Sequence, residues 1–256
     1  MTDSLQVEDL NRSIGDFEKA QKEWEELPDK LNDEMDSLRL KSPVLYLKAT
    51  SKRDDIQETF KEIINKFKEI SQGIAAPYLF VRYAADWQAV AATVRGAHAT
   101  LEDPNVSMEG HWSGLAKERY STSVAAQMKA MSTTVELCNN VHDELISLAR
   151  AGHLLYTEIV KAIAGFYASI TEVIVDVSTV FGVLEALGAI GSLAANTINS
   201  MTSIFTTYVG NLQEQGISAN KLKNLRNNPF GMPNNRWPQA LGKDFNDPKL
   251  WELATS

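Results

Sequence analysis

The sequence predicts an all-α fold, an elongated helical bundle, on three observations. Apolar residues make up 44% of the 256 residues, which is enough to bury a core. Glycine and proline are few, 14 and 8 respectively, and they cluster, so long uninterrupted elements are expected. Between these clusters apolar residues recur at steps of three, four or seven, the spacing of one face of a helix.

Residues 5–41 are expected to be helical, with Pro28 causing a kink or a division into two shorter helices. The apolar residues of this stretch form a seam, in which five recur every seven positions and two take companion positions. This seam either packs a surface helix onto the bundle or docks a partner. Its members are Leu10, Ile14, Phe17, Trp24, Leu31, Met35 and Leu38.

The next two helices are predicted from the residues that would begin and end them. Ser42-Pro43 breaks the first pattern, and Asp54 or Asp55 is expected to cap a helix that runs to Ile70. Gly73 then ends this helix and Pro77 begins another, which is expected over about 78–102. Many small residues in this third helix allow a neighbouring helix to approach closely.

The chain is organised around a short break at His111-Trp112-Ser113-Gly114. Trp112 is a large aromatic in a polar loop, where it is placed to cap a helical hairpin, and Gly114 lets the backbone fold closely beneath it. Apolar residues then continue at helical steps from Leu115 through Val177 to Phe181. A fourth helix from 115 to about 182 is therefore expected.

Residues 186–213 contain no charged residue. A segment of this length is long enough to span a bilayer, but its many Ser, Thr, Asn and Gly residues dilute its apolarity. We favour a helix buried in the bundle or in an oligomer interface over a membrane-inserting hairpin and over a permanent transmembrane helix. The residues expected to contact a membrane or another subunit are Leu187, Ile190, Leu193, Ile198, Ile204 and Phe205.

The carboxyl-terminal tail is rich in Asn and Pro and is expected to be irregular. It carries large aromatic anchors that would lie along the bundle or on a partner: Phe230, Trp237, Phe245 and Trp251. Four segments are thus expected: amino-terminal helices at 1–75, a helical hairpin at 76–182, an uncharged helix at 183–215 and the tail at 216–256.

The sequence contains no constellation that indicates catalysis. Metal-binding, phosphate-binding and nucleophile-elbow motifs are absent, so we expect no enzyme activity, no cofactor and no metal. Cys138, the only cysteine, lies on an apolar helical stripe and is expected to be a buried thiol. The net charge of −8 argues against nucleic-acid binding, and the acidic amino terminus does not resemble a Sec signal peptide.

Trp112-Ser113-Gly114, between two helices, resembles the Trp-X-Gly signature of the WXG superfamily, the helical-hairpin proteins exported by type VII (ESX) secretion in actinobacteria and Firmicutes. The run Leu115-Ala116-Lys117-Glu118-Arg119-Tyr120 is similar to the start of the family's second helix, and 76–87 resembles the start of its first helix. The tail around Arg236-Trp237-Pro238 is similar to the ends of some secreted actinobacterial proteins. The resemblance covers roughly 76–182 and implies a four-helix assembly of two hairpins, or of one hairpin with further helices of the same chain.

The chain departs from the family in one feature. Members or their partners carry Tyr-x-x-x-Asp/Glu after the second helix, and this motif forms the export signal together with the Trp. Here Tyr120, Tyr156, Tyr167 and Tyr208 are all followed by other residues four positions later. Either a partner supplies the motif, or the tail supplies a degenerate form, or the chain is not itself addressed to the channel.

The resemblance implies a non-enzymatic type VII secretion substrate that pairs with a helical partner or with itself and that contacts the secretion machinery. It would be cytoplasmic before export and secreted or at the cell surface afterwards. Trp112, Ser113 and Gly114 would form the recognition element. Two alternatives stay open: a membrane-active or pore-forming helical effector that uses 186–213, and a targeting module for a toxin encoded elsewhere.

Overall fold

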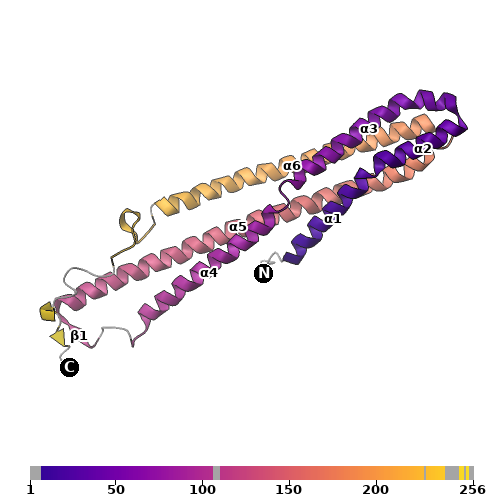
Figure 1. Cartoon of the computed structure of the whole chain (residues 1–256). Helices are drawn as coiled ribbons and strands as arrows, with labels where there is room; N and C mark the ends of the chain where they lie inside the picture. The colour runs from indigo at the N-terminus through magenta and orange to yellow at the C-terminus, as the bar shows by residue number, and fades with distance from the viewer. Residues whose placement is uncertain (1–6, 106–109, 228, 240–247, 251, 254–256) are drawn as a thin grey trace. The chain divides into compact units, whose positions relative to one another are not determined.

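The computed structural model confirms an all-α helical bundle (Figure 1). It describes every residue except 1–6, 106–109, 228, 240–247, 251 and 254–256. Two compact units are present: unit 1 comprises 1–79 and 148–213, and unit 2 comprises 80–147 and 214–256. The elements are α1 (Val7–Glu25), α2 (Leu27–Lys41), α3 (Pro43–Ser71), α4 (Ala76–Glu102), β1 (Trp112–Ser113), α5 (Gly114–Asp176), α6 (Val183–Asn227), η1 (Pro233–Asn235), η3 (Pro248–Leu250) and β2 (Glu252–Leu253).

Prolines lie at the starts of three helices, whereas the sequence predicted a break in the pattern at Pro28 and at Pro43 and a helix start only at Pro77. Pro28 is in the first turn of α2, so the predicted interruption of 5–41 divides it into α1 and α2. Pro43 is the first residue of α3, and Pro77 is the second residue of α4. Proline is favoured there because its missing N–H would have no partner in the first helical turn.

One predicted helix start is wrong. We expected a helix to begin after Asp54 or Asp55, but α3 begins at Pro43 and those aspartates lie inside it. Leu45 and Tyr46 pack against the core and Ala49 is fully buried, so this short apolar run belongs to the same buried face as Ile56. This stretch was too short to be assigned to a helix from its apolar pattern, and its helical structure is explained by tertiary packing.

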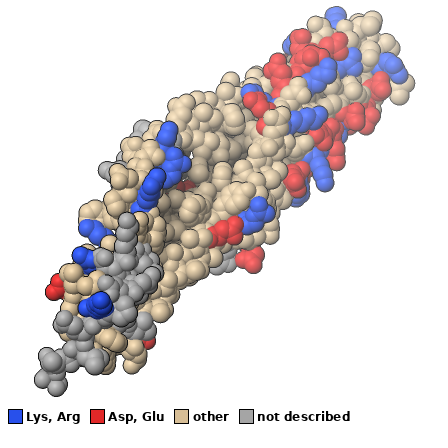
Figure 2. Space-filling view, turned by 60° about the vertical axis from the view of Figure 1, so that its left-hand side comes forward, with Lys and Arg blue, Asp and Glu red and all other residues tan. Residues whose placement is uncertain are grey.

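The apolar seam of the first two helices is buried in the core of unit 1. Its seven-residue repeat of large side chains, from Leu10 to Leu38, is at most 1% exposed at every position. Phe17 lies 5.3 Å from Phe67 of α3 and 5.1 Å from Tyr156 of α5, measured between ring centroids. Burial also raises the pKa of Tyr156 to about 12, so its phenol stays neutral at physiological pH. The seam serves the packing of the chain itself, and charged residues cover the outside of α2 and α3 (Figure 2).

Gly152 marks a tight approach of α5 to the start of α4, inside unit 1. A Cβ atom at this position would lie 2.5 Å from Cγ of the Pro77 ring, which is too rigid to move aside cheaply. We expect Gly152→Ala to destabilise unit 1 by about 1–3 kcal/mol through overpacking.

Thermal unfolding followed by circular dichroism would measure this effect. Gly165→Ala is a matched control in the same helix, because no atom lies within 4 Å of its added Cβ. The control should stabilise the protein by about 0.5–1 kcal/mol, since alanine favours a helix interior over glycine. Equal effects of the two substitutions would contradict the close contact with Pro77.

The helix predicted to run to about 182 ends earlier, at Asp176. Thr179 Oγ1 donates to the Asp176 carbonyl at 2.6 Å and so satisfies the helix end, and Gly182 has a φ of +86°. Phe181, predicted to continue the buried stripe, is 92% exposed in this turn. The threonine side chain and the left-handed glycine end the helix here, although the apolar spacing in the sequence continues past them.

The following helix also differs from expectation at its carboxyl end. α6 runs to Asn227, twelve residues beyond the predicted end of the uncharged helix at 215. The first part of the expected irregular tail is therefore helical. Among the described residues, no helix combines the length and apolarity that crossing a bilayer requires.

Unit 2 is built differently from unit 1. Hydrogen bonds join α4 to α5 with antiparallel numbering, from Gln88 Nε2 to Asn139 Oδ1 at 3.3 Å and between His98 and Ser132 at 3.3 Å. Among its described residues, the buried hydrophobic side chains are all small: Ala84, Ala91, Ala116, Ala130 and Cys138. The large core cluster lies entirely in unit 1.

Candidate recognition site at the α4–α5 junction

The predicted recognition residues lie where the chain passes from the loop after α4 into α5. Trp112 and Ser113 form the short strand β1, and Gly114 is the first residue of α5. Gly114 has a φ of +84°, a conformation that residues with a Cβ rarely adopt, so a glycine is required at this turn. The Trp112 side chain is 38% exposed. An indole that is partly in contact and partly exposed can support the loop and still be recognised by another molecule.

The carboxyl-terminal segment pairs with this loop. β2 is antiparallel to β1, with Trp112 opposite Leu253 and Ser113 opposite Glu252. The two strands are 140 residues apart in the sequence, so no local pattern indicated this pairing. The segment Glu252–Leu253 is thereby placed directly beside the Trp112 backbone.

Further contacts hold the tail on the first part of α5, within unit 2. The Trp237 indole N–H donates to Gln127 Oε1 at 3.1 Å, and Gln127 Nε2 donates to the Pro238 carbonyl at 3.0 Å. Lys129 Nζ lies 3.7 Å from the centroid of the Phe230 ring, a cation–π contact. These contacts place both residues against α5, although Phe230 is 69% exposed and Trp237 45% exposed. The other two expected anchors, Phe245 and Trp251, lie outside the described residues.

The six residues expected to contact a membrane or another subunit lie on the inner side of α6, in unit 1. Leu187 and Ile190 are buried in its core. The other four are partly buried and pack against that core: Leu193, Ile198, Ile204 and Phe205. The apolar side of the uncharged stretch 186–213 is thus used within the unit itself.

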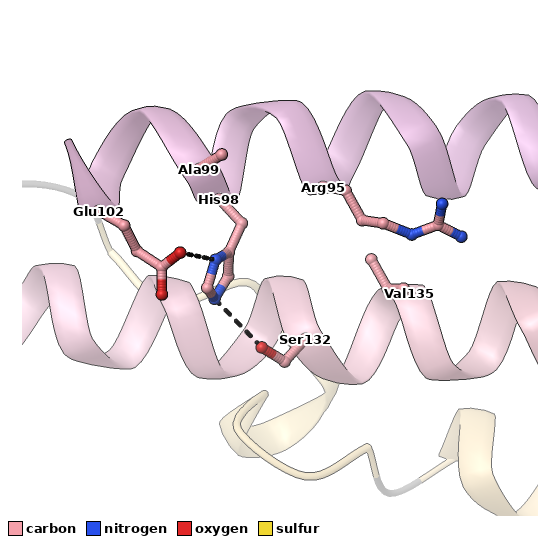
Figure 3. A pocket seen from close by; sticks show the side chains of 6 residues that line it. All are labelled: Arg95, His98, Ala99, Glu102, Ser132 and Val135. Atoms are coloured by element: carbon pink, nitrogen blue, oxygen red, sulfur yellow. Dashed lines mark hydrogen bonds and ion pairs between the residues drawn. The ribbon is translucent and has the colours of Figure 1, made fainter.

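A shallow pocket between α4 and α5 brings together Arg95, His98, Glu102 and Ser132 (Figure 3). His98 Nδ1 lies 3.4 Å from Glu102 Oε2, and Nε2 lies 3.3 Å from Ser132 Oγ. The connectivity is that of a serine–histidine–carboxylate chain. The spacing of His98 and Glu102 by four residues could have indicated their pairing, but Ser132 comes from another helix.

The local chemistry does not favour nucleophilic catalysis in this pocket. The Met128 carbonyl lies 3.0 Å from Ser132 Oγ and competes with His98 Nε2 for the single hydroxyl proton. Ser132 also lies in the middle of α5, where backbone N–H groups are engaged in the helix and cannot stabilise an oxyanion. We interpret the cluster as a polar contact that sets the register of α4 against α5.

The remaining candidates for chemistry are Cys138 and clusters of metal ligands. Cys138 is buried as expected, and burial raises the pKa of its thiol against the opposing effect of Arg95. A raised pKa keeps the thiol protonated and weakly reactive. Within the part of the chain that the structure describes, no three His, Cys, Asp or Glu side chains gather as a metal site would require.

Compared with known proteins, the chain matches no protein-family model, no curated protein and no solved structure.

Proposed function

We propose that the protein is a non-enzymatic substrate of type VII secretion, of the WXG kind, and that it acts through association with other proteins. The observation that carries this proposal is the placement of Trp112-Ser113-Gly114 between α4 and α5, with a left-handed glycine and a partly exposed indole. A packing anchor would be expected to be buried like Trp24, which is 1% exposed. An accessible indole in a fixed turn favours recognition.

The α4 surface supports pairing with a helical partner or with a second copy. Tyr83, Trp87 and Val90 follow helical spacing and are 45%, 37% and 46% exposed. Unit 2 buries only small apolar side chains among its described residues, so two helices alone leave its large ones without a core. A second helical pair on this face would bury them and complete a four-helix assembly.

The tail is a candidate source of the recognition element that the missing Tyr-x-x-x-Asp/Glu motif would otherwise provide. Because β2 pairs with β1, the carboxyl-terminal segment reaches the position beside Trp112 where a second recognition element is needed. We therefore favour the tail of the same chain, over a partner, as the source of this element.

Export is the direct test of the proposed function. The wild type and Trp112→Ala would be expressed in an actinobacterium with and without its type VII secretion ATPase, and the medium would be blotted. We expect wild-type protein outside the cell only when the ATPase is present, and Trp112→Ala only inside.

Leu154→Ala is the control, because Leu154 is 56% exposed but belongs neither to the junction nor to the α4 face proposed for pairing. Loss of the Leu154 side chain should leave export at the wild-type level. Thermal unfolding must show that both variants are folded. Export of Trp112→Ala at the wild-type level, or export that does not need the ATPase, would contradict the proposal.

A further inference from the structure

The two units bury very different cores. Unit 1 buries many large apolar side chains, among them Trp24, Phe60 and Ile159, in one continuous cluster. In the described part of unit 2, the buried hydrophobic side chains are four alanines and Cys138. Stabilisation by burial rises with the apolar area removed from water, so a methyl group contributes far less than a phenyl or indole ring. The core of unit 2 is therefore the weaker of the two.

Polar contacts join α4 to α5 in unit 2. Gln88 Nε2 and Arg95 Nη2 share one acceptor, Asn139 Oδ1, at 3.3 and 3.2 Å. His98 Nε2 lies 3.3 Å from Ser132 Oγ (Figure 3). These distances are at the long end of the range for hydrogen bonds, and the Arg95 and His98 contacts are exposed. Water can replace such contacts, so separating the two helices costs little.

The large apolar side chains of α4 add little to this interface. Tyr83, Trp87 and Val90 keep 45%, 37% and 46% of their surface exposed in the closed structure. Gly96 lies inside the helix and lowers its intrinsic stability, because glycine loses more backbone freedom than alanine when it becomes helical. The part of α4 in unit 2 is thus held neither by a large core nor by strong helix propensity.

The start of α4, by contrast, is fixed in unit 1. Tyr78 Oη donates to Asn11 Oδ1 of α1 at 2.8 Å, and the Tyr78 ring packs against the core. Pro77 contacts Gly152 of α5 at the tight approach described above. The boundary between the two units crosses α4 just after Leu79. The residues after this boundary can therefore leave α5 while the first turn of the helix stays in place.

We infer that α4 opens away from α5 in unit 2 while unit 1 stays folded, with the start of α4 as the hinge. Local opening is expected where buried apolar contacts are few and the joining hydrogen bonds face water. The opening makes unit 2 the part of the chain that can rearrange. It needs no partner and no export, so it does not depend on the proposed function.

Cys138, the only cysteine of the chain, is a natural probe of this opening. It is 1% exposed in the closed structure. It lies next to Asn139, to which two α4 side chains are bonded. Burial raises the pKa of its thiol, and the charge of Arg95 on α4 opposes this rise, which also places α4 near the thiol. A reagent as large as dithiobis-nitrobenzoate therefore reaches Cys138 after α4 has moved.

Labelling of Cys138 would be compared with labelling of a thiol in unit 1, introduced by Ala49→Cys together with Cys138→Ala. Ala49 is fully buried in α3. Each rate is divided by the rate of the same thiol in urea-unfolded protein, which removes differences in intrinsic reactivity. We expect Cys138 to react at least about tenfold faster, because it needs only the local opening, whereas unit 1 must unfold to expose the other thiol.

Phe17→Ala separates local opening from global unfolding, because Phe17 is fully buried in unit 1. It should speed the labelling of the thiol introduced by Ala49→Cys and leave the labelling of Cys138 nearly unchanged. A similar increase at both thiols would overturn the inference. Equal normalised rates of the two thiols without Phe17→Ala would also overturn it.

Hydrogen exchange of the wild type, followed by mass spectrometry, is a second measurement that needs no substitution. The amides of α4 after Ala84 should exchange at least about tenfold faster than those of α3 around Phe60, because a helix without tertiary packing is only marginally stable in water. Equal protection of the two helices would contradict the inference, whether or not the Ala49→Cys variant folds.

Discussion

Replacing Phe17 by alanine should lower the free energy of unfolding of unit 1 by about 3–5 kcal/mol, the usual cost of removing a buried phenylalanine. Phe17 is fully buried on α1 and contacts the rings of Phe67 on α3 and Tyr156 on α5. Its loss would leave a cavity where three helices meet. Neither neighbouring ring can fill the space without giving up its own packing, so little of the cost would be recovered.

Chemical denaturation followed by circular dichroism would measure the change. Phe230→Ala makes the same chemical change at a site that is 69% exposed, and it should alter unfolding by far less. A loss below about 1 kcal/mol for Phe17→Ala would show that α1 is not part of the cooperative core, given the usual size of such cavities.

The features that sequence reasoning predicted are those with a local signal. The seven-residue repeat from Leu10 to Leu38 identifies buried positions, because each helix repeats its core-facing side at a fixed interval. Pro28 and Pro43 indicate breaks between helices through the geometry of their own rings, although the helix start at Pro43 itself was not predicted. The α5 end was missed because the apolar spacing continues through Val177 and Phe181, whereas a threonine hydroxyl and Gly182 decide the boundary.

In the candidate site, too, only the features with a local sequence signal could be predicted. The position of Trp112 between two helices could be predicted from Gly114 and from the apolar stretches on either side. The pairing of β1 with β2 could not, because it joins segments 140 residues apart and depends on where the tail contacts α5. The contact between the α2–α3 and α5–α6 turns could not be predicted for a related reason, because Lys41 and Lys52 reach the Ser178 and Leu184 carbonyls from more than 130 residues away in the sequence.

Gly231→Ala should release the tail from α5 and leave the helices folded. Gly231 has a φ of +82°, which alone costs a residue with a Cβ about 1–3 kcal/mol. The added Cβ would also lie 3.0 Å from Lys129 Cγ and 3.2 Å from the Ala130 backbone nitrogen, so the tail cannot keep its position on the helix. The Phe230–Lys129 and Trp237–Gln127 contacts are then lost together, because both depend on this approach.

Limited trypsin digestion would report the release as faster cleavage after Arg236, next to Trp237. Gly210→Ala is the control, because its Cβ would meet no atom within 4 Å and it lies in α6. Unchanged cleavage in Gly231→Ala would show that the tail does not need the contact with Ala130. The same variant separates two roles of the tail. If release also stops export while thermal unfolding stays normal, the tail is part of the recognition element at Trp112. If export continues, Trp112 acts without it, and the partner must supply the second element.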